Sequence, residues 1–126
     1  MIAKNNPFNI VSRRNKKRVG QISTKKGLCV FSSLYFGIRA ALLFYMVNYR
    51  KFDIKSIHDI CNRITFNDDL EKCIVSKTKI APLKELNSEM DYALVLKAMS
   101  EYFGNPVPLE EILSCMEQSK LHMSVF

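Results

Sequence analysis

Three carboxylates stand beside apolar helical positions and are the candidates for acid–base chemistry. Glu101 follows an apolar stripe over 94–99, and Asp69 and Glu71 lie at the start of another predicted helix. A carboxyl in a partly apolar cleft has a raised pKa and can protonate a leaving oxygen, as glycan cleavage requires, usually with a second carboxylate opposite. Each also has an ordinary structural interpretation, because acids at a helix start complement the helix dipole and acids beside a basic partner form a solvated face.

A run of positive charge near the N-terminus is the second chemical signal. Residues 1–52 contain eleven Lys and Arg and no acid, whereas residues 53–126 contain eight against twelve acids, so the net charge of +7 is unevenly distributed. A block of one sign favours an anionic partner, such as nucleic acid, a membrane surface or an acidic polysaccharide. The side chains expected to contact the anion are Arg13, Arg14, Lys16, Lys17 and Arg18. No aromatic residue interleaves with them, so general anion attraction or a solvated loop is favoured over specific nucleic-acid binding.

The cysteines and histidines predict neither a metal site nor a disulfide framework. The cysteines at 29, 61, 73 and 115 form no CxxC pair, and three of them lie in apolar runs, which is typical of buried, reduced thiols. His58 and His122 have no partner at ligand spacing, and His58 beside Asp59 is expected to be a surface residue rather than a base. Without a phosphate-cradling glycine loop, no nucleotide cofactor is predicted either.

The elements that position these residues are predicted to be mostly helices in a single domain, 1–126. Residues 34–49 are apolar on every face, which predicts a central buried helix capped by Ser32 or Ser33. Further helices are expected over 53–63, after a cap at Asn67, from a capping box at Ser88 to Gly104, and over 109–119.

A small non-helical cap is expected over 1–31, ahead of a helical body over 32–119 and a tail over 120–126. Residues 5–21 predict either a hairpin with a basic turn or an ordered arm, and 27–31 an extended piece beside it. Residues 1–18 lack the apolar stretch of a signal peptide, and the apolar run 34–49 is too short and too interrupted for a bilayer span. The protein is therefore expected to be cytoplasmic at synthesis, with no transmembrane segment.

An ordered series of short motifs runs along the chain, and it resembles that of a known family. The motifs are Asn-Asn-Pro at 5–7 with Asn-Ile at 9–10, Gly-Gln at 20–21, Lys-Gly-Leu-Cys-Val-Phe-Ser-Ser at 26–33, Gly-Ile-Arg-Ala-Ala at 37–41, and Ile-Cys-Asn-Arg at 60–63. Together they resemble small phage and prophage virion structural proteins that are considered lysozyme-like, over about residues 2–116. The signature residues are Asn5, Asn6, Pro7, Asn9, Gly37, Arg39, Asn62 and Arg63.

Several departures mark a diverged member of that family. Phe8 stands where the family has glycine, and Arg18 and Ile64 stand where it has tryptophan. Relatives end a C-terminal Ala-Met helix in Glu-Asn-Gly, whereas here the corresponding segment is Phe-Gly-Asn at 103–105, which leaves Glu101 as the nearest acid.

The resemblance implies a lysozyme-like helical domain and a phage- or prophage-derived structural protein that engages peptidoglycan, with virion association. If active, such a protein is a glycan-strand hydrolase or transglycosylase, and the missing acid favours weak activity or none. The alternative is a non-catalytic basic module for nucleic acid or an acidic protein, and a third is a pseudo-enzyme without a ligand. The signature asparagines favour fold maintenance over a sugar-binding edge. Arg39, inside an apolar helix, is expected to pair with a carboxylate or carbonyls if it is buried.

Overall fold

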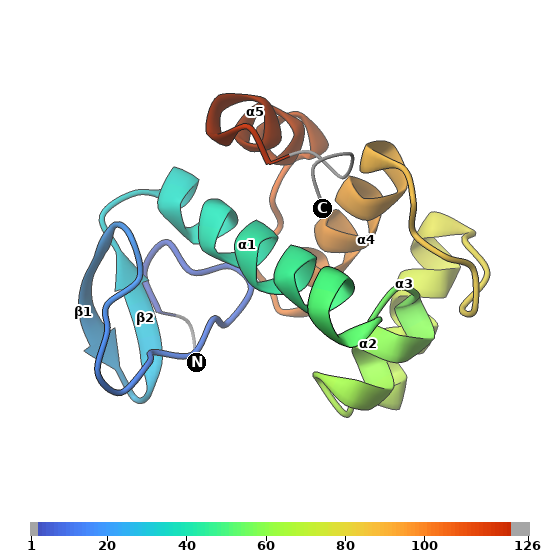
Figure 1. Ribbon diagram of the computed structural model, residues 1–126, viewed down its shortest axis with the longest axis horizontal. Helices are drawn as coiled ribbons and strands as arrows, with labels where there is room; N and C mark the ends of the chain where they lie inside the picture. Colours follow the sequence, from blue (N-terminus) through green and yellow to red (C-terminus); the bar gives the residue numbers. More distant parts are fainter. Residues whose placement is uncertain (1–2, 122–126) are drawn as a thin grey trace.

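A two-stranded antiparallel hairpin precedes five helices in the computed structural model, which describes residues 3–121 (Figure 1). The elements are β1 (Gln21–Lys25), β2 (Leu28–Phe31), α1 (Leu34–Phe52), α2 (Ile57–Arg63), α3 (Asp68–Thr78), α4 (Glu89–Tyr102) and α5 (Leu109–Ser119). The protein is thus mostly helical with a small strand pair near the N-terminus, as predicted. Most of the expected tail, including His122, lies outside the described residues.

The hairpin turns through Lys26 and Gly27. Both residues have positive φ, 50° and 85°, and two-residue hairpin turns favour this left-handed geometry because it matches the twist of the strands. At the other end of the ladder, Gln21 lies opposite Phe31. The extended piece predicted over 27–31 therefore contains the second strand.

The basic segment ahead of β1 is an ordered arm, and the hairpin lies further along the chain than the 5–21 hairpin that was one of the two alternatives. Val11 joins the arm to the sheet through an isolated bridge to Leu28, and the Ser12 N–H donates to the Gly27 carbonyl at 2.9 Å. The charged run 13–17 is exposed throughout. With no apolar alternation, that run has no face to bury and no register to hold it in a sheet.

Buried asparagine side chains hold the arm against β2. The Asn6 amide nitrogen donates to the carbonyls of Ile10 and Cys29, both at 2.9 Å, and its oxygen accepts from the Ile10 N–H at 2.8 Å. Asn6 is only 1% exposed. The neighbouring Asn5 amide donates to the Phe31 carbonyl at 2.9 Å. The arm is therefore joined to β2 partly by the side-chain hydrogen bonds of Asn5 and Asn6, where two strands would be joined by backbone hydrogen bonds alone.

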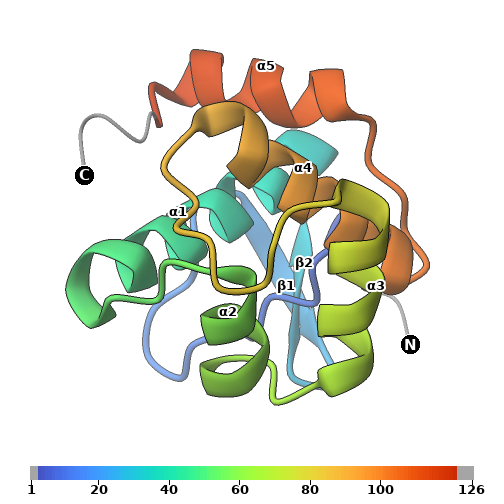
Figure 2. The ribbon, with the colours of Figure 1, turned by 90° about the vertical axis from the view of Figure 1, so that its right-hand side faces the viewer.

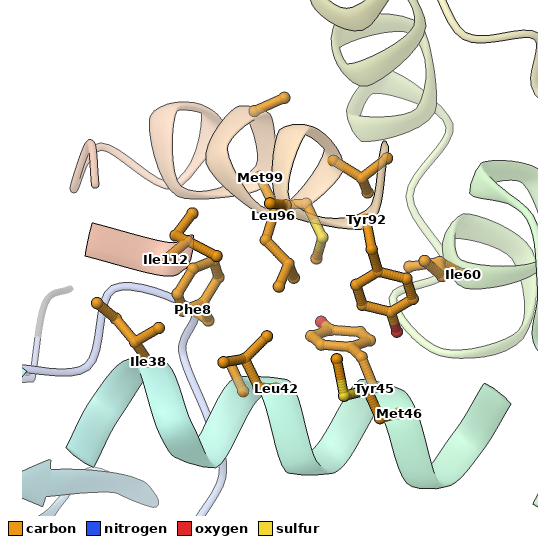
Figure 3. Close-up of a cluster of buried hydrophobic side chains, with 14 of the residues drawn as sticks. Phe8, Ile38, Leu42, Tyr45, Met46, Ile60, Tyr92, Leu96, Met99 and Ile112 are labelled. Carbon is orange, nitrogen blue, oxygen red and sulfur yellow. The ribbon is translucent and has the colours of Figure 1, made fainter. Parts of the chain in front are cut away.

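One face of α1 closes the core, as its periodicity predicted. Figure 3 shows Ile38, Leu42 and Tyr45 pointing from α1 toward Leu96 and Met99 of α4. All five are almost completely buried. Within the described residues no helix, α1 included, combines the length and apolar character needed to cross a bilayer.

The prediction that every face of α1 is buried is wrong. Leu43 and Phe44 are half-buried, and Val47 is 37% exposed. The basic arm lies over this side of the helix and covers it only in part, which leaves an apolar surface in contact with solvent.

The later helices begin at hydroxyl or amide caps. Ser56, Asn67 and Ser88 each accept a hydrogen bond from a backbone N–H in the first turn of α2, α3 and α4. The helix predicted from residue 53 begins only at Ile57, because Asp53 takes the left-handed conformation that ends α1, with φ of 54°. The caps predicted at Asn67 and Ser88, and the bounds predicted for α5, are confirmed.

The helices pack in a chain of neighbours. α4 contacts α3 and α5, α2 contacts α3, and α1 contacts α5 and β2. Figure 1 places the hairpin at one end of the long axis and α2 with α3 at the other, and Figure 2 shows α5 lying across α4. The basic arm and α3, which carries the candidate acids Asp69 and Glu71, are therefore at opposite ends of the molecule (Figure 1).

Candidate functional site

Glu101 lies at the end of α4 between two lysines. Its carboxylate accepts hydrogen bonds from Lys97 Nζ at 2.9 Å and from Lys77 Nζ at 3.2 Å. The hydrogen bond from Lys97 is the largest cause that lowers the pKa of Glu101 below its usual value. Burial acts in the opposite direction, and the hydrogen bond from Lys77 together with the charges of both lysines leaves the net shift downward. A general acid needs the reverse shift. Glu101 therefore lacks the environment that glycan protonation requires, and it links α3 to α4.

Glu71 joins α3 to α2. Its Oε1 accepts from Asn62 Nδ2 at 2.9 Å and lies 3.2 Å from His58 Nδ1, and Asn62 Nδ2 also donates to the His58 carbonyl at 2.8 Å. His58 is an exposed surface residue, as expected, but it has an acidic neighbour that its position in the sequence did not indicate. The signature residue Asn62 thus orders the contact between two helices, and Arg63 beside it is exposed.

Asp69 is exposed in the first turn of α3, where it complements the helix dipole. None of the three candidate carboxylates, Asp69, Glu71 and Glu101, lines any of the four hollows described below. The candidate carboxylates thus lie in helix contacts and on the surface, outside these four hollows.

Four of the five predicted anion-binding residues surround a polar depression of about 400 Å³, which we call the basic hollow. Its lining consists of Ser12, Arg13, Arg14, Asn15, Lys16, Lys17, Gln21 and Thr24. The four charged side chains are exposed, so an anion reaches them without any opening of the structure.

Gln21 gives the basic hollow its shape. This buried side chain accepts from the Arg18 N–H at 2.9 Å and donates to Ser12 Oγ at 2.9 Å and to Thr24 Oγ1 at 3.2 Å. A neutral amide with both donors and an acceptor can tie the two ends of the loop to β1 without adding charge. The sequence contained Gln21 only as part of a motif, and the reach of its side chain was not predictable from spacing.

A second depression, about 460 Å³, lies between the loop and the exposed side of α1, and we call it the arginine-rimmed groove. It is lined by Arg13, Arg18, Val19, Arg39, Ala40, Leu43, Phe44 and Val47. Its floor is apolar, and the Arg18 guanidinium lies 6.0 Å from the centre of the Phe44 ring, within reach of a cation–π contact. The groove therefore combines hydrocarbon surface with three permanent positive charges.

The arginines around this groove have no acidic partner within residues 3–121. Burial is the largest cause that lowers the pKa of Arg18, and the charge of nearby Arg13 lowers it further. Arg39 is half-buried and, contrary to one expectation, forms no ion pair with any carboxylate among residues 3–121. Guanidinium groups that repel one another and lack a carboxylate are stabilised by an incoming anion.

The ion pairs of the described residues all lie in the other half of the chain. They join Lys55 to Asp53 and Glu85, His58 to Glu71, Lys84 to Asp91, and Glu101 to Lys77 and Lys97. The lysines and arginines of residues 4–39 have no acid near them in the sequence, and no lysine or arginine of residues 4–51 forms an ion pair within residues 3–121.

Two smaller hollows border the signature asparagines. One of about 270 Å³ includes Asn9, Arg18 and Phe44, and the buried Asn9 Oδ1 has no hydrogen-bond partner within the described residues. Another of about 280 Å³ is lined by the Asn5, Asn6 and Pro7 segment and by residues after α4. Arg18 and Phe44 also line the arginine-rimmed groove, so the two hollows are neighbours.

The four cysteines are free thiols, and those at 29, 61 and 115 are buried. Burial raises the pKa of Cys61 to about 11 and also raises those of Cys29 and Cys115. Within residues 3–121 no group of three or more metal-ligating side chains comes together.

The groove itself is what sequence reasoning missed. Arg39, Leu43 and Val47 repeat every four residues and so share one side of α1, but the apolar residues on every other side hid this stripe. Arg39, followed at intervals of four by Leu43 and Val47, was the sequence signal that could have indicated the groove.

The chain matches no known protein-family model, and no curated protein is significantly similar to it in sequence.

Proposed function

We propose that this chain is a non-catalytic binding protein of phage or prophage origin, which engages peptidoglycan through the basic hollow. One observation carries the proposal: Arg13, Arg14, Lys16 and Lys17 stand exposed around a pre-shaped depression and have no carboxylate partner in the part of the chain that the structure describes. Peptidoglycan presents carboxylates along its peptide stems, and charge-assisted hydrogen bonds from guanidinium and ammonium groups suit them. The phage origin rests on the resemblance of the motifs at 5–10, 37–41 and 60–63.

The proposal places a lysozyme-like scaffold behind this surface, with α1 as its central helix. Its support is the buried face of α1, where Ile38, Leu42 and Tyr45 meet α4, together with the contacts of α1 with α5 and β2. In the setting that the resemblance implies, the protein is made in the cytoplasm and joins other virion proteins.

No hydrolase or transglycosylase activity is part of this proposal. The carboxylate of Glu101 is held ionised by Lys97 and Lys77, and Glu71 is engaged by Asn62. Neither side chain faces a second carboxylate across one of the described hollows.

A nucleic acid or an acidic protein is the second candidate partner, and the arginines favour it. Arg13 and Arg14 present planar guanidinium forks that bind phosphate with two parallel hydrogen bonds. The basic hollow has no aromatic side chain on which a base stacks, which makes sequence-independent phosphate contact the expected mode.

The deciding experiment sediments the purified protein with peptidoglycan sacculi over a range of salt concentrations, with duplex DNA measured in parallel. The Arg14→Gln/Lys16→Gln variant is expected to bind sacculi about tenfold more weakly, since each lost contact is a charge-assisted hydrogen bond. Arg50→Gln/Lys72→Gln removes the same charge at exposed positions outside the hollow and serves as the matched control.

Equal loss in the two double variants contradicts a site at the basic hollow. Tighter binding to DNA than to sacculi, with a steep dependence on salt, favours the second candidate. Soluble muropeptides released by the wild type, and absent after Glu101→Gln or Glu71→Gln, contradict the non-catalytic assignment.

A further inference from the structure

The arginine-rimmed groove presents an amphiphilic surface that polymer binding at the basic hollow does not use. Only Arg13 lines both depressions. The floor of the groove is formed by Leu43, Phe44 and Val47 of α1, and Val19 stands at its edge with 58% of its surface exposed. Aliphatic side chains at this exposure, grouped with positive charge, mark a surface that is covered in use.

The positive charges around the groove favour a ligand that carries negative charge. Residues 3–52 contain no acid, and Arg18 and Arg39 lack carboxylate partners among the described residues. Arg13 stands close enough to Arg18 to lower its pKa, beyond the larger effect of burial. An occupant that fits must therefore carry a negative group at the rim and a hydrocarbon part on the floor.

We propose that the groove binds an anionic phospholipid at a membrane surface, with its phosphate on Arg18 and Arg39 and one acyl chain along Leu43 and Val47. The volume of about 460 Å³ lies within the range of ligand pockets in proteins. Basic residues beside exposed aliphatic ones bind anionic bilayers through both charge and apolar insertion. Ile22, 58% exposed in β1, adds apolar surface to the same cap.

Other occupants fit this surface less well. A single-stranded nucleic acid gains affinity from rings on which bases stack, and Phe44, the aromatic residue among the lining, already lies under Arg18; a duplex contacts a protein through its phosphates and leaves an aliphatic floor unused. A second copy of the chain has exposed apolar residues close to acids, Phe66 near Asp68 and Leu83 near Glu85, but these are short side chains on separate loops, and the dimer outcome of the test below covers this case.

The test is co-sedimentation with vesicles made of equal parts of phosphatidylglycerol and phosphatidylcholine, against vesicles of phosphatidylcholine alone. The wild type is expected to bind the anionic vesicles and to keep part of that binding at about 1 M salt, where the screening length is about 3 Å. Inorganic phosphate at the same ionic strength is expected to leave binding unchanged.

Val47→Asp is expected to weaken vesicle binding about tenfold or more, because a carboxylate replaces a side chain that contacts the acyl chain. Its matched control is Leu83→Asp, at an aliphatic residue that is 75% exposed and lies outside the groove. Val19→Asp provides a second variant in a loop, where a substitution leaves the helices intact. For charge, Arg39→Gln is expected to lose about fivefold, and Arg50→Gln, on the same helix but outside the groove, less than about twofold.

The lipid site and the peptidoglycan site can be tested independently of each other. Val47→Asp should bind peptidoglycan sacculi as the wild type does, because Val47 does not line the basic hollow. No binding to anionic vesicles, equal loss in Val47→Asp and Leu83→Asp, or full displacement by inorganic phosphate each overturns the lipid site. A concentration-dependent dimer that Val47→Asp abolishes, without vesicle binding, replaces the lipid by a second copy of the chain.

Discussion

The backbone carbonyl of Asn5 occupies the space that a side chain at position 37 needs. A Cβ added to Gly37 collides with that oxygen and also comes within 3.3 Å of Pro7 Cδ. The N-terminal arm can therefore lie against α1 only because the helix carries glycine there. Two signature motifs far apart in the sequence, Asn-Asn-Pro and Gly-Ile-Arg-Ala, are thus two sides of one contact.

Gly37→Ala is expected to destabilise the protein by about 2 kcal/mol or more, although alanine is the better helix former, because the arm must move. Urea unfolding measures the change. Ser76→Ala, at an exposed position in α3, is the control and should change the stability by less than about 0.5 kcal/mol. An increase in stability for Gly37→Ala contradicts the close contact.

Asn6→Asp is expected to cost about 3 kcal/mol at neutral pH. A carboxylate cannot donate to the carbonyls of Ile10 and Cys29, and it places an unpaired charge where the side chain is 1% exposed. The measurement is again unfolding by denaturant, with Asn87→Asp, at an exposed asparagine, as the control. Similar stabilities for the two variants would show that Asn6 does not hold the arm.

Replacement of Glu101 by Gln should remove stability only where the carboxylate is charged. The pKa of Glu101 in the folded protein lies below its usual value of 4.5, so its contribution is present above that pH and is lost as the pH falls through the lowered pKa. The ion pairs are partly exposed, so the expected loss at neutral pH is below about 1 kcal/mol. Thermal unfolding from neutral to acid pH, with Glu117→Gln as the control, tests the prediction. A difference that grows toward acid pH contradicts it.

Tyr92→Phe is expected to leave stability unchanged or to raise it by about 1 kcal/mol. The Tyr92 hydroxyl is buried and has no hydrogen-bond partner among the described residues, so its removal relieves a desolvation cost. Burial also raises the pKa of Tyr92 well above 10, so the wild type loses stability as the pH rises above 10, where the unfolded chain releases this proton. The advantage of the variant should therefore grow by about 1.4 kcal/mol per pH unit there.

Alkaline unfolding of the two proteins measures that slope. Tyr102→Phe, at a half-exposed tyrosine that accepts a hydrogen bond from Asn67, is the control. A loss of several kcal/mol in Tyr92→Phe would place a partner at the hydroxyl.

The helices were well predicted from local sequence, because capping residues and prolines mark where helices begin and end. Ser88 and Asn67 cap where their types indicated, and α5 follows Pro108 as expected. The start of α2 was missed, since the left-handed turn at Asp53 leaves no mark in composition.

The candidate site was predictable by charge but not by shape. The basic segment was identified from its residues. The arm, in contrast, packs on α1 through the contact of Asn5 with Gly37 and is held to β2 by the hydrogen bond of Asn6 with Cys29, and each contact joins residues more than twenty positions apart. The ion pair of Glu101 with Lys97 was within reach of helical spacing, while that with Lys77 needed the packing of α3 on α4.

The separation of charge along the molecule makes the protein an electric dipole. Its basic cap, which has no acid, lies at one end of the long axis, and α2 and α3, which carry both acids and bases, lie at the other (Figure 1). The field of a negatively charged surface exerts a torque on such a molecule and turns the cap forward before any contact forms. Orientation during approach is therefore a property of the whole chain, and salt should slow the arrival of the protein even where it leaves the final contacts intact.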